Sequence, residues 1–120
     1  MSIVYENVVK EIGSQVGAFG DEELIILFGD HAPDGLREYC HLIDVKPTIE
    51  RIQVGQILTL GDKVYEITAV GNVVEKNLVE LGHITIMFDG ANEAALPGTL
   101  YVKGNDLPKL EVGSSIIITN

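Results

Sequence analysis

The chain has 120 residues, of which 46% are hydrophobic and 22% charged. This composition is typical of one folded domain, which we expect to span residues 1–120. Eighteen acidic residues against eight basic ones give a net charge of −10. The charge argues against nucleic-acid binding, because that affinity comes largely from Lys and Arg contacts with phosphates.

The longest apolar run, residues 24–28, is far shorter than the about 20 residues that span a membrane. Direct membrane insertion is therefore not expected. The first residues show neither the basic start nor the long apolar stretch of a secretory signal. The single cysteine, Cys40, cannot form an internal disulfide and suits a reducing compartment. We therefore expect a cytoplasmic protein.

Short apolar or alternating runs, separated by turn residues, recur along the chain and predict β-strands whose alternate residues form the core. Pro33 and Gly35 mark a turn over residues 31–35. Gly61 and Asp62 stand between two alternating arms and predict a two-residue hairpin turn. The expected strands cover residues 3–12, 24–28, 39–45, 57–60, 64–70, 83–88, 99–102 and 115–119.

One short helix is expected over residues 73–81, where apolar side chains recur at helical spacing. Asn72 is a suitable N-cap, and Glu75 three residues later completes a pattern like a capping box. Gly82 fits the left-handed conformation that ends many helices. Together the elements predict a small, mainly β barrel or sandwich with one short helix.

The chain carries no motif that identifies a cofactor or a metal. No paired Cys or His spacing supports a zinc site, so we expect no metal. A phosphate-binding loop, a dinucleotide fingerprint and the Gly-x-Ser-x-Gly nucleophile elbow are all absent. We expect no cofactor.

Three histidines remain as candidates for chemistry. His31 lies in the expected turn and is most simply a solvated loop residue, and His41 lies on an expected strand beside Tyr39. His83 follows the expected helix end, where it can bond to free carbonyls. A neutral imidazole is nucleophilic near pH 7 and can accept and pass on a phosphoryl group without a metal.

Thr-Ala-Val-Gly occupies residues 68–71, and the block over residues 69–90 continues with Asn-Leu-x-Glu-Leu-Gly-His and Phe-Asp-Gly at these spacings. With Ala32-Pro33, Glu38-Tyr39-Cys40 and Pro97-Gly98-Thr99, they make the chain resemble the sorbitol (glucitol)-specific IIA components of the bacterial sugar phosphotransferase system. The resemblance implies a compact β-barrel. It also implies a cytoplasmic carrier that accepts phosphate from the phosphocarrier protein HPr. The carrier passes it to the IIB part of the membrane sorbitol permease (IIB/IIC).

The resemblance places the family's phosphorylated histidine at Ile43, with a second histidine at Val45, and neither residue can accept phosphate. His41, two positions before Ile43, is then the first candidate acceptor and His83 the second. We expect both to open onto one shared concavity. The alternative is a non-catalytic regulatory or interaction module on the same fold, in which phosphotransfer is lost. Whether the chain is an enzyme stays open at this point.

Overall fold

The computed structural model describes residues 2–19, 23–104 and 106–120. The strands are β1 (Ile3–Val8), β2 (Glu11–Ile12), β3 (Leu24–Gly29), β4 (His41–Ile43), β5 (Ile57–Leu60), β6 (Lys63–Val70), β7 (Ile84–Met87), β8 (Thr99–Lys103) and β9 (Ser115–Thr119). The helices are α1 (Asp34–Arg37), α2 (Val74–Leu81) and the 3-10 helix η1 (Val16–Phe19).

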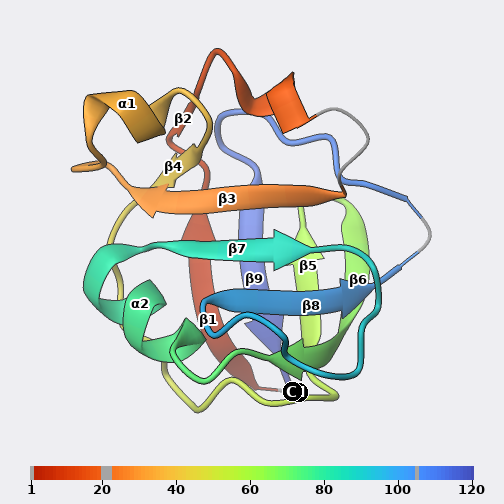
Figure 1. Cartoon of the computed structure of the whole chain (residues 1–120). Coiled ribbons are helices and arrows are strands. Elements are labelled where there is room, and N and C mark those ends of the chain that lie inside the picture. The colour runs from red at the N-terminus through yellow and green to blue at the C-terminus, as the bar shows by residue number, and fades with distance from the viewer. Residues whose placement is uncertain (1, 20–22, 105) are drawn as a thin grey trace.

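These strands form one curled sheet in the order β1-β9-β5-β6-β8-β7-β3-β4-β2. Figure 1 shows β3, β7 and β8 crossing in front of β1, β9 and β5, with α1 and α2 at the same side of the molecule. The expected small, mainly β fold is confirmed. The described part of the chain contains two α-helices, one more than expected.

The N-terminal segment links the two edges of the sheet. β1 pairs with β9 at one edge, and β2 pairs with β4 at the other. Between them the chain bends at Val9, which is buried and whose N–H donates to the Ser114 carbonyl, and at Lys10, whose N–H donates to the Leu42 carbonyl. The single strand expected over residues 3–12 is therefore two strands, and their bend curls the sheet.

The hairpin turn and the core follow the predicted pattern. Leu60 of β5 pairs with Lys63 of β6, so Gly61 and Asp62 make the two-residue turn. The expected alternation places one face of most strands in the interior, and burying each large apolar side chain stabilises the fold by roughly 1.5–3 kcal/mol. The interior residues of these strands include Leu58, Leu60, Tyr65, Ile67, Ile84, Ile86, Ile116 and Ile118.

The start of helix α2 differs from the prediction, whereas its end agrees with it. The expected cap at Asn72 is wrong: Val73 holds the N-cap position and makes no side-chain cap hydrogen bond. The Glu75 carboxylate accepts instead from the backbone N–H of Ile52, at 2.9 Å. The expected stop is confirmed, because Gly82 ends the helix in the left-handed region at φ 67°.

The segment between β3 and β4 also differs from prediction. Residues 34–37 form α1, and turn hydrogen bonds continue through Tyr39 and Cys40. The strand expected over residues 39–45 is therefore only His41–Ile43, which pairs in parallel with β3. A second apolar cluster lies on this outer side of the sheet and contains Phe28, Ala32, Cys40 and Leu42.

Candidate functional site

His41 lies within the sheet, opposite Leu27 of β3 and Ile12 of β2. Only 7% of the residue is exposed. Within residues 2–19, 23–104 and 106–120, its Nδ1 is the one buried side-chain polar atom without a hydrogen-bond partner. Burial lowers the pKa of His41, because desolvation disfavours the charged ring. His41 is thus a neutral imidazole with little access to solvent.

His83 lies directly after the end of α2, and its backbone N–H donates to the Asn77 carbonyl at 3.2 Å. The expected contact with a free helix carbonyl is thus made by the backbone. The imidazole ring stacks on Phe28, with ring centroids 4.1 Å apart and an interplanar angle of 11°. The residue is half-buried, and burial lowers its pKa. His83 therefore offers a neutral ring that is still reached by solvent.

The two candidate histidines lie on opposite faces of the sheet. β3 and β4 pair with His41 opposite Leu27 and with Leu42 opposite Phe28. Leu27 belongs to the interior cluster and Phe28 to the outer one. Because side chains alternate along a strand, His41 shares the inner face with Leu27, whereas His83 covers Phe28 from outside. The expected shared concavity is therefore wrong.

A third histidine contacts the same Phe28 ring as His83. His31 lies edge-on to Phe28, with ring centroids 5.9 Å apart and an interplanar angle of 84°. We call Phe28, His31 and His83 the aromatic–histidine cluster. Sequence reasoning read His31 as a solvated loop residue, and no local pattern joins it to His83. The antiparallel pairing of β3 with β7 brings the two segments together.

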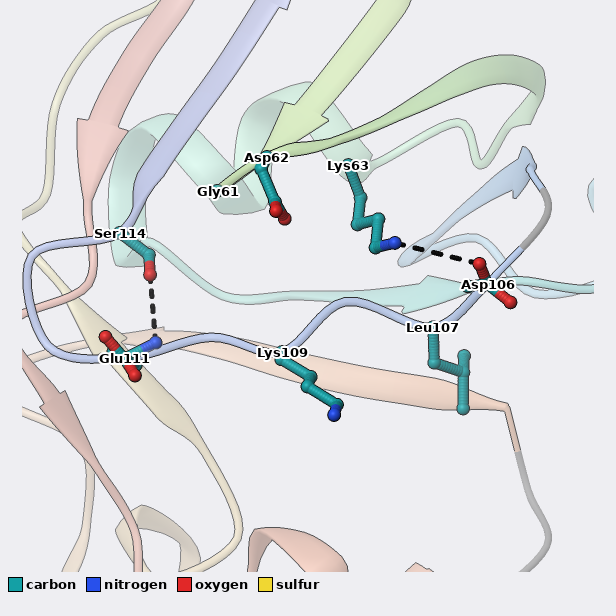
Figure 2. Close-up of a pocket in the computed structure, with 8 residues that line it drawn as sticks. All are labelled: Gly61, Asp62, Lys63, Asp106, Leu107, Lys109, Glu111 and Ser114. Atoms are coloured by element: carbon teal, nitrogen blue, oxygen red, sulfur yellow. Dashed lines mark hydrogen bonds and ion pairs between the residues drawn. The ribbon is translucent and has the colours of Figure 1, made fainter.

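A pocket in the described part of the chain lies away from these histidines. It has a volume of about 770 Å³ and is formed by the β5–β6 turn and the chain between β8 and β9 (Figure 2). Lys63 reaches Asp106 across it at 3.7 Å, and Ser114 Oγ accepts from the Glu111 backbone N–H. Its lining mixes both charges and contains no histidine, so it does not offer an imidazole acceptor.

In the described ranges, no group of three or more His, Cys, Asp or Glu side chains is placed to hold a metal ion. The chemistry available at the aromatic–histidine cluster is therefore that of two imidazole rings beside an aromatic ring. Neutral imidazole supplies a nucleophilic nitrogen and an N–H donor. Such a cluster can accept an electrophilic group and bind an anion.

Comparison with known proteins decides the family. Residues 4–117 match the family model described as "PTS system glucitol/sorbitol-specific IIA component". The chain is 41% identical over 105 residues to the "PTS system glucitol/sorbitol-specific EIIA component" of Escherichia coli (strain K12), covering 87% of this chain and 85% of the relative. It is 38% identical over 104 residues to the protein of the same name from Shigella flexneri, with the same coverage. The chain belongs to the glucitol/sorbitol-specific IIA component family.

A solved structure supports the fold of this IIA component. The crystal structure of a PTS system IIA component from Enterococcus faecalis V583 superposes with a TM-score of 0.82 and 27% identity, covering 97% of this chain and 100% of that one. No helix in the described ranges has the length and apolarity needed to cross a membrane.

The position that the resemblance gives to the phosphorylated histidine lies next to the aromatic–histidine cluster of this IIA component. Ile43 is fully buried, and its Cγ1 lies 3.4 Å from the place where a Cβ on Gly82 would stand. Val45 is 40% exposed, and its Cγ2 lies 2.8 Å from the corresponding point on Gly29. His83 follows Gly82, so the junction of β3, β4 and the end of α2 still carries histidine at its surface.

Proposed function

We propose that the chain is a cytoplasmic phosphocarrier that accepts a phosphoryl group from HPr and passes it to the IIB part of a sorbitol-type permease. Family membership supports the place in a phosphotransferase system. The observation that carries the proposal is the half-buried imidazole of His83, stacked on Phe28 beside the position that the family resemblance assigns to the acceptor.

His83 is better placed than His41 to act as acceptor. A donor protein must bring its phosphohistidine within bonding distance, and His41 is 7% exposed on the inner face of the sheet. His83 is solvent-accessible, and its lowered pKa keeps one ring nitrogen unprotonated near neutral pH. Stacking on Phe28 fixes the ring plane, so less orientational freedom is lost when the reacting atoms align.

The transfer needs only the two imidazoles and the phosphoryl group. The lone pair of the neutral His83 nitrogen forms a new N–P bond as the N–P bond to the donor histidine breaks. The electron pair of the broken bond stays with the donor imidazole, which takes up a proton, and the phosphorylated ring releases one from its second nitrogen. Passage to IIB repeats the same exchange with this chain as donor.

Incubation with phosphoenolpyruvate, enzyme I and HPr tests the proposal. We expect an acid-labile mass increase of one phosphoryl group in the wild type. His83→Gln should lose it, and His41→Gln should keep it. Full labelling of His83→Gln together with loss in His41→Gln would return the acceptor role to His41.

The second candidate function is a non-catalytic regulatory or interaction module. It is favoured by Ile43 and Val45, which stand where the resemblance places two histidines. The same incubation separates the two functions when a IIA protein that accepts label is run beside this chain. An unlabelled wild type with a labelled control supports the regulatory module and overturns phosphotransfer.

A further inference from the structure

Phe28 holds two imidazole rings on the outer face of the sheet. His83 lies parallel to the Phe28 ring, whereas His31 approaches it edge-on. Among the described residues, no hydrogen bond or ion pair uses a ring nitrogen of either histidine. Both rings therefore keep their donors and acceptors for a ligand.

His31 is exposed, yet the turn that carries it is held in place. The Ala32 N–H donates to the Gly29 carbonyl at 3.0 Å, which closes the turn after β3. Ala32 is itself 4% exposed and packs in the outer cluster. Arg37 Nη1 also donates to the Asp30 carbonyl, at 3.4 Å. The backbone on both sides of His31 is thus held by hydrogen bonds.

Gly29 places His31 and the end of α2 beside one another. The point where a Gly29 Cβ would stand lies 2.7 Å from His31 Cε1 and 2.7 Å from the Leu81 carbonyl oxygen. The corresponding point on Gly82 lies 2.9 Å from the Gly29 nitrogen. Because His83 follows Gly82 directly, both rings border the same junction. Only glycine at position 29 leaves the room that this approach requires.

His31 is a hydrogen-bond donor at this junction that no carboxylate of the described residues occupies. Two basic side chains near it are already paired with carboxylates: Lys10 with Asp30 and Asp44, and Arg37 with Glu11. A phosphoryl group on His83 carries oxygens that need hydrogen-bond donors, and an imidazole N–H supplies one. His31, whose ring contacts the same Phe28 as His83, offers such a donor.

We propose that His31 is the second histidine of the phosphoryl site and donates a hydrogen bond to a phosphoryl oxygen while the group is carried on His83. This inference rests on the proposed function. His31 forms no covalent bond in the step. Its N–H donates to the phosphoryl oxygen that gains negative charge as the group passes between nitrogens. This hydrogen bond stabilises the transition state of the transfer more than it stabilises the resting protein.

Phosphorylation kinetics of His31 variants test the role. His31→Ala should keep full labelling at His83 but slow the transfer from HPr by about tenfold to a hundredfold, the loss expected for one hydrogen bond to a charged group. His31→Gln retains an N–H donor and should recover part of the rate. Lys109→Ala, in the distant pocket of Figure 2, serves as the control and should react at the wild-type rate.

NMR spectra of the imidazole nitrogens supply a readout that a merely structural role does not move. Phosphorylation of His83 should shift the ring N–H of His31 and leave the His41 ring unchanged. A His31→Ala protein labelled at the wild-type rate overturns the inference and leaves the proposed function standing. Label that stays in His83→Gln and disappears in His31→Ala also overturns it, because His31 would then be the acceptor.

A titration with inorganic phosphate separates failure of the inference from failure of the proposed function. If the wild type takes no label, transfer is refuted. The anion site then remains supported when phosphate shifts the His31 and His83 resonances along one saturating curve that His31→Ala abolishes. No shift of either ring, or a shift of His83 alone, overturns the site.

Discussion

Replacement of Gly82 by alanine tests the junction that positions His83. Gly82 has φ 67°, and an added Cβ would stand 2.9 Å from the Gly29 nitrogen and 3.2 Å from the Gly29 Cα. These are backbone atoms of β3, so the contact cannot be relieved by rotation of a side chain. Helix α2 and β3 must move apart to accommodate the methyl group.

The expected loss of stability has three parts. A left-handed alanine costs about 1–2 kcal/mol. The smaller conformational freedom of alanine in the unfolded chain returns about 0.4–1 kcal/mol. Overpacking against β3 adds about 1–3 kcal/mol. Gly82→Ala should therefore lower the free energy of unfolding by about 1–4.5 kcal/mol, measured by urea denaturation followed by circular dichroism.

Gly61→Ala is the matched control. Gly61 has nearly the same conformation, φ 63°, but the nearest atoms to an added Cβ are 3.9 Å away. It should show only the conformational part, about 0–1.5 kcal/mol. The difference between the two variants isolates the contact with Gly29. Equal destabilisation of both would refute close packing of the α2 end on β3, and with it the positioning of His83 by that contact.

Three further predictions concern other parts of the chain. Asn72→Ala should change the free energy of unfolding by less than about 0.5 kcal/mol, whereas Glu75→Ala should cost about 1–3 kcal/mol by leaving the Ile52 N–H without its acceptor; urea denaturation compares them. Cys40 is buried and its thiol pKa is raised by burial, so a thiol reagent should modify it only in denaturant, and rapid modification of the native protein would contradict its placement. Burial lowers the pKa of His41 below the 6.5 of the unfolded chain, so the unfolded state binds a proton first as the pH falls. The stability contributed by neutral His41 is therefore lost as the pH falls through about 6.5. His41→Gln should lose less stability than the wild type between about pH 7.5 and about pH 5.5, and equal losses would exclude a buried neutral His41.

Features fixed by a few adjacent residues could be predicted from the sequence. The turn at Gly61 and Asp62 lies between arms of clear alternation, and its geometry needs only a residue that tolerates positive φ. The stop at Gly82 has the same origin. Both features depend only on residues that are close neighbours in the sequence.

Features that depend on a distant partner could not be predicted. Glu75 has the spacing of a capping box, but the backbone N–H of Ile52 takes its carboxylate and Asn72 remains exposed. Alternation placed His41 and Leu42 on different faces of a strand. It could not say which face lies inside the curled sheet, because both neighbours of His41 in the sequence are also buried.

The candidate site shows the same division. The sequence identified His83 from its family motif but assigned His31 to solvent, because the contact of both rings with Phe28 depends on the pairing of β3 with β7. The expected partnership of His41 with His83 failed for a related reason. His41 was chosen because it lies two residues before Ile43 on the same strand. Its side chain is on the inner face of the sheet, whereas His83 stacks on Phe28 on the outer face, so the two rings do not meet.

Ile43, at the position that the resemblance gives to the phosphorylated histidine, has a structural role at this junction. Its side chain has no exposed surface and packs beside Gly82, so it stabilises the contact between β4 and the end of α2. An imidazole in that interior place would lose solvation, as the unpartnered Nδ1 of the buried His41 already does. His31 and His83 reach the same junction from the solvent side, where a partner protein can approach. Under the proposed function, phosphotransfer depends on the surface of this junction, whereas Ile43 bears mainly on its stability.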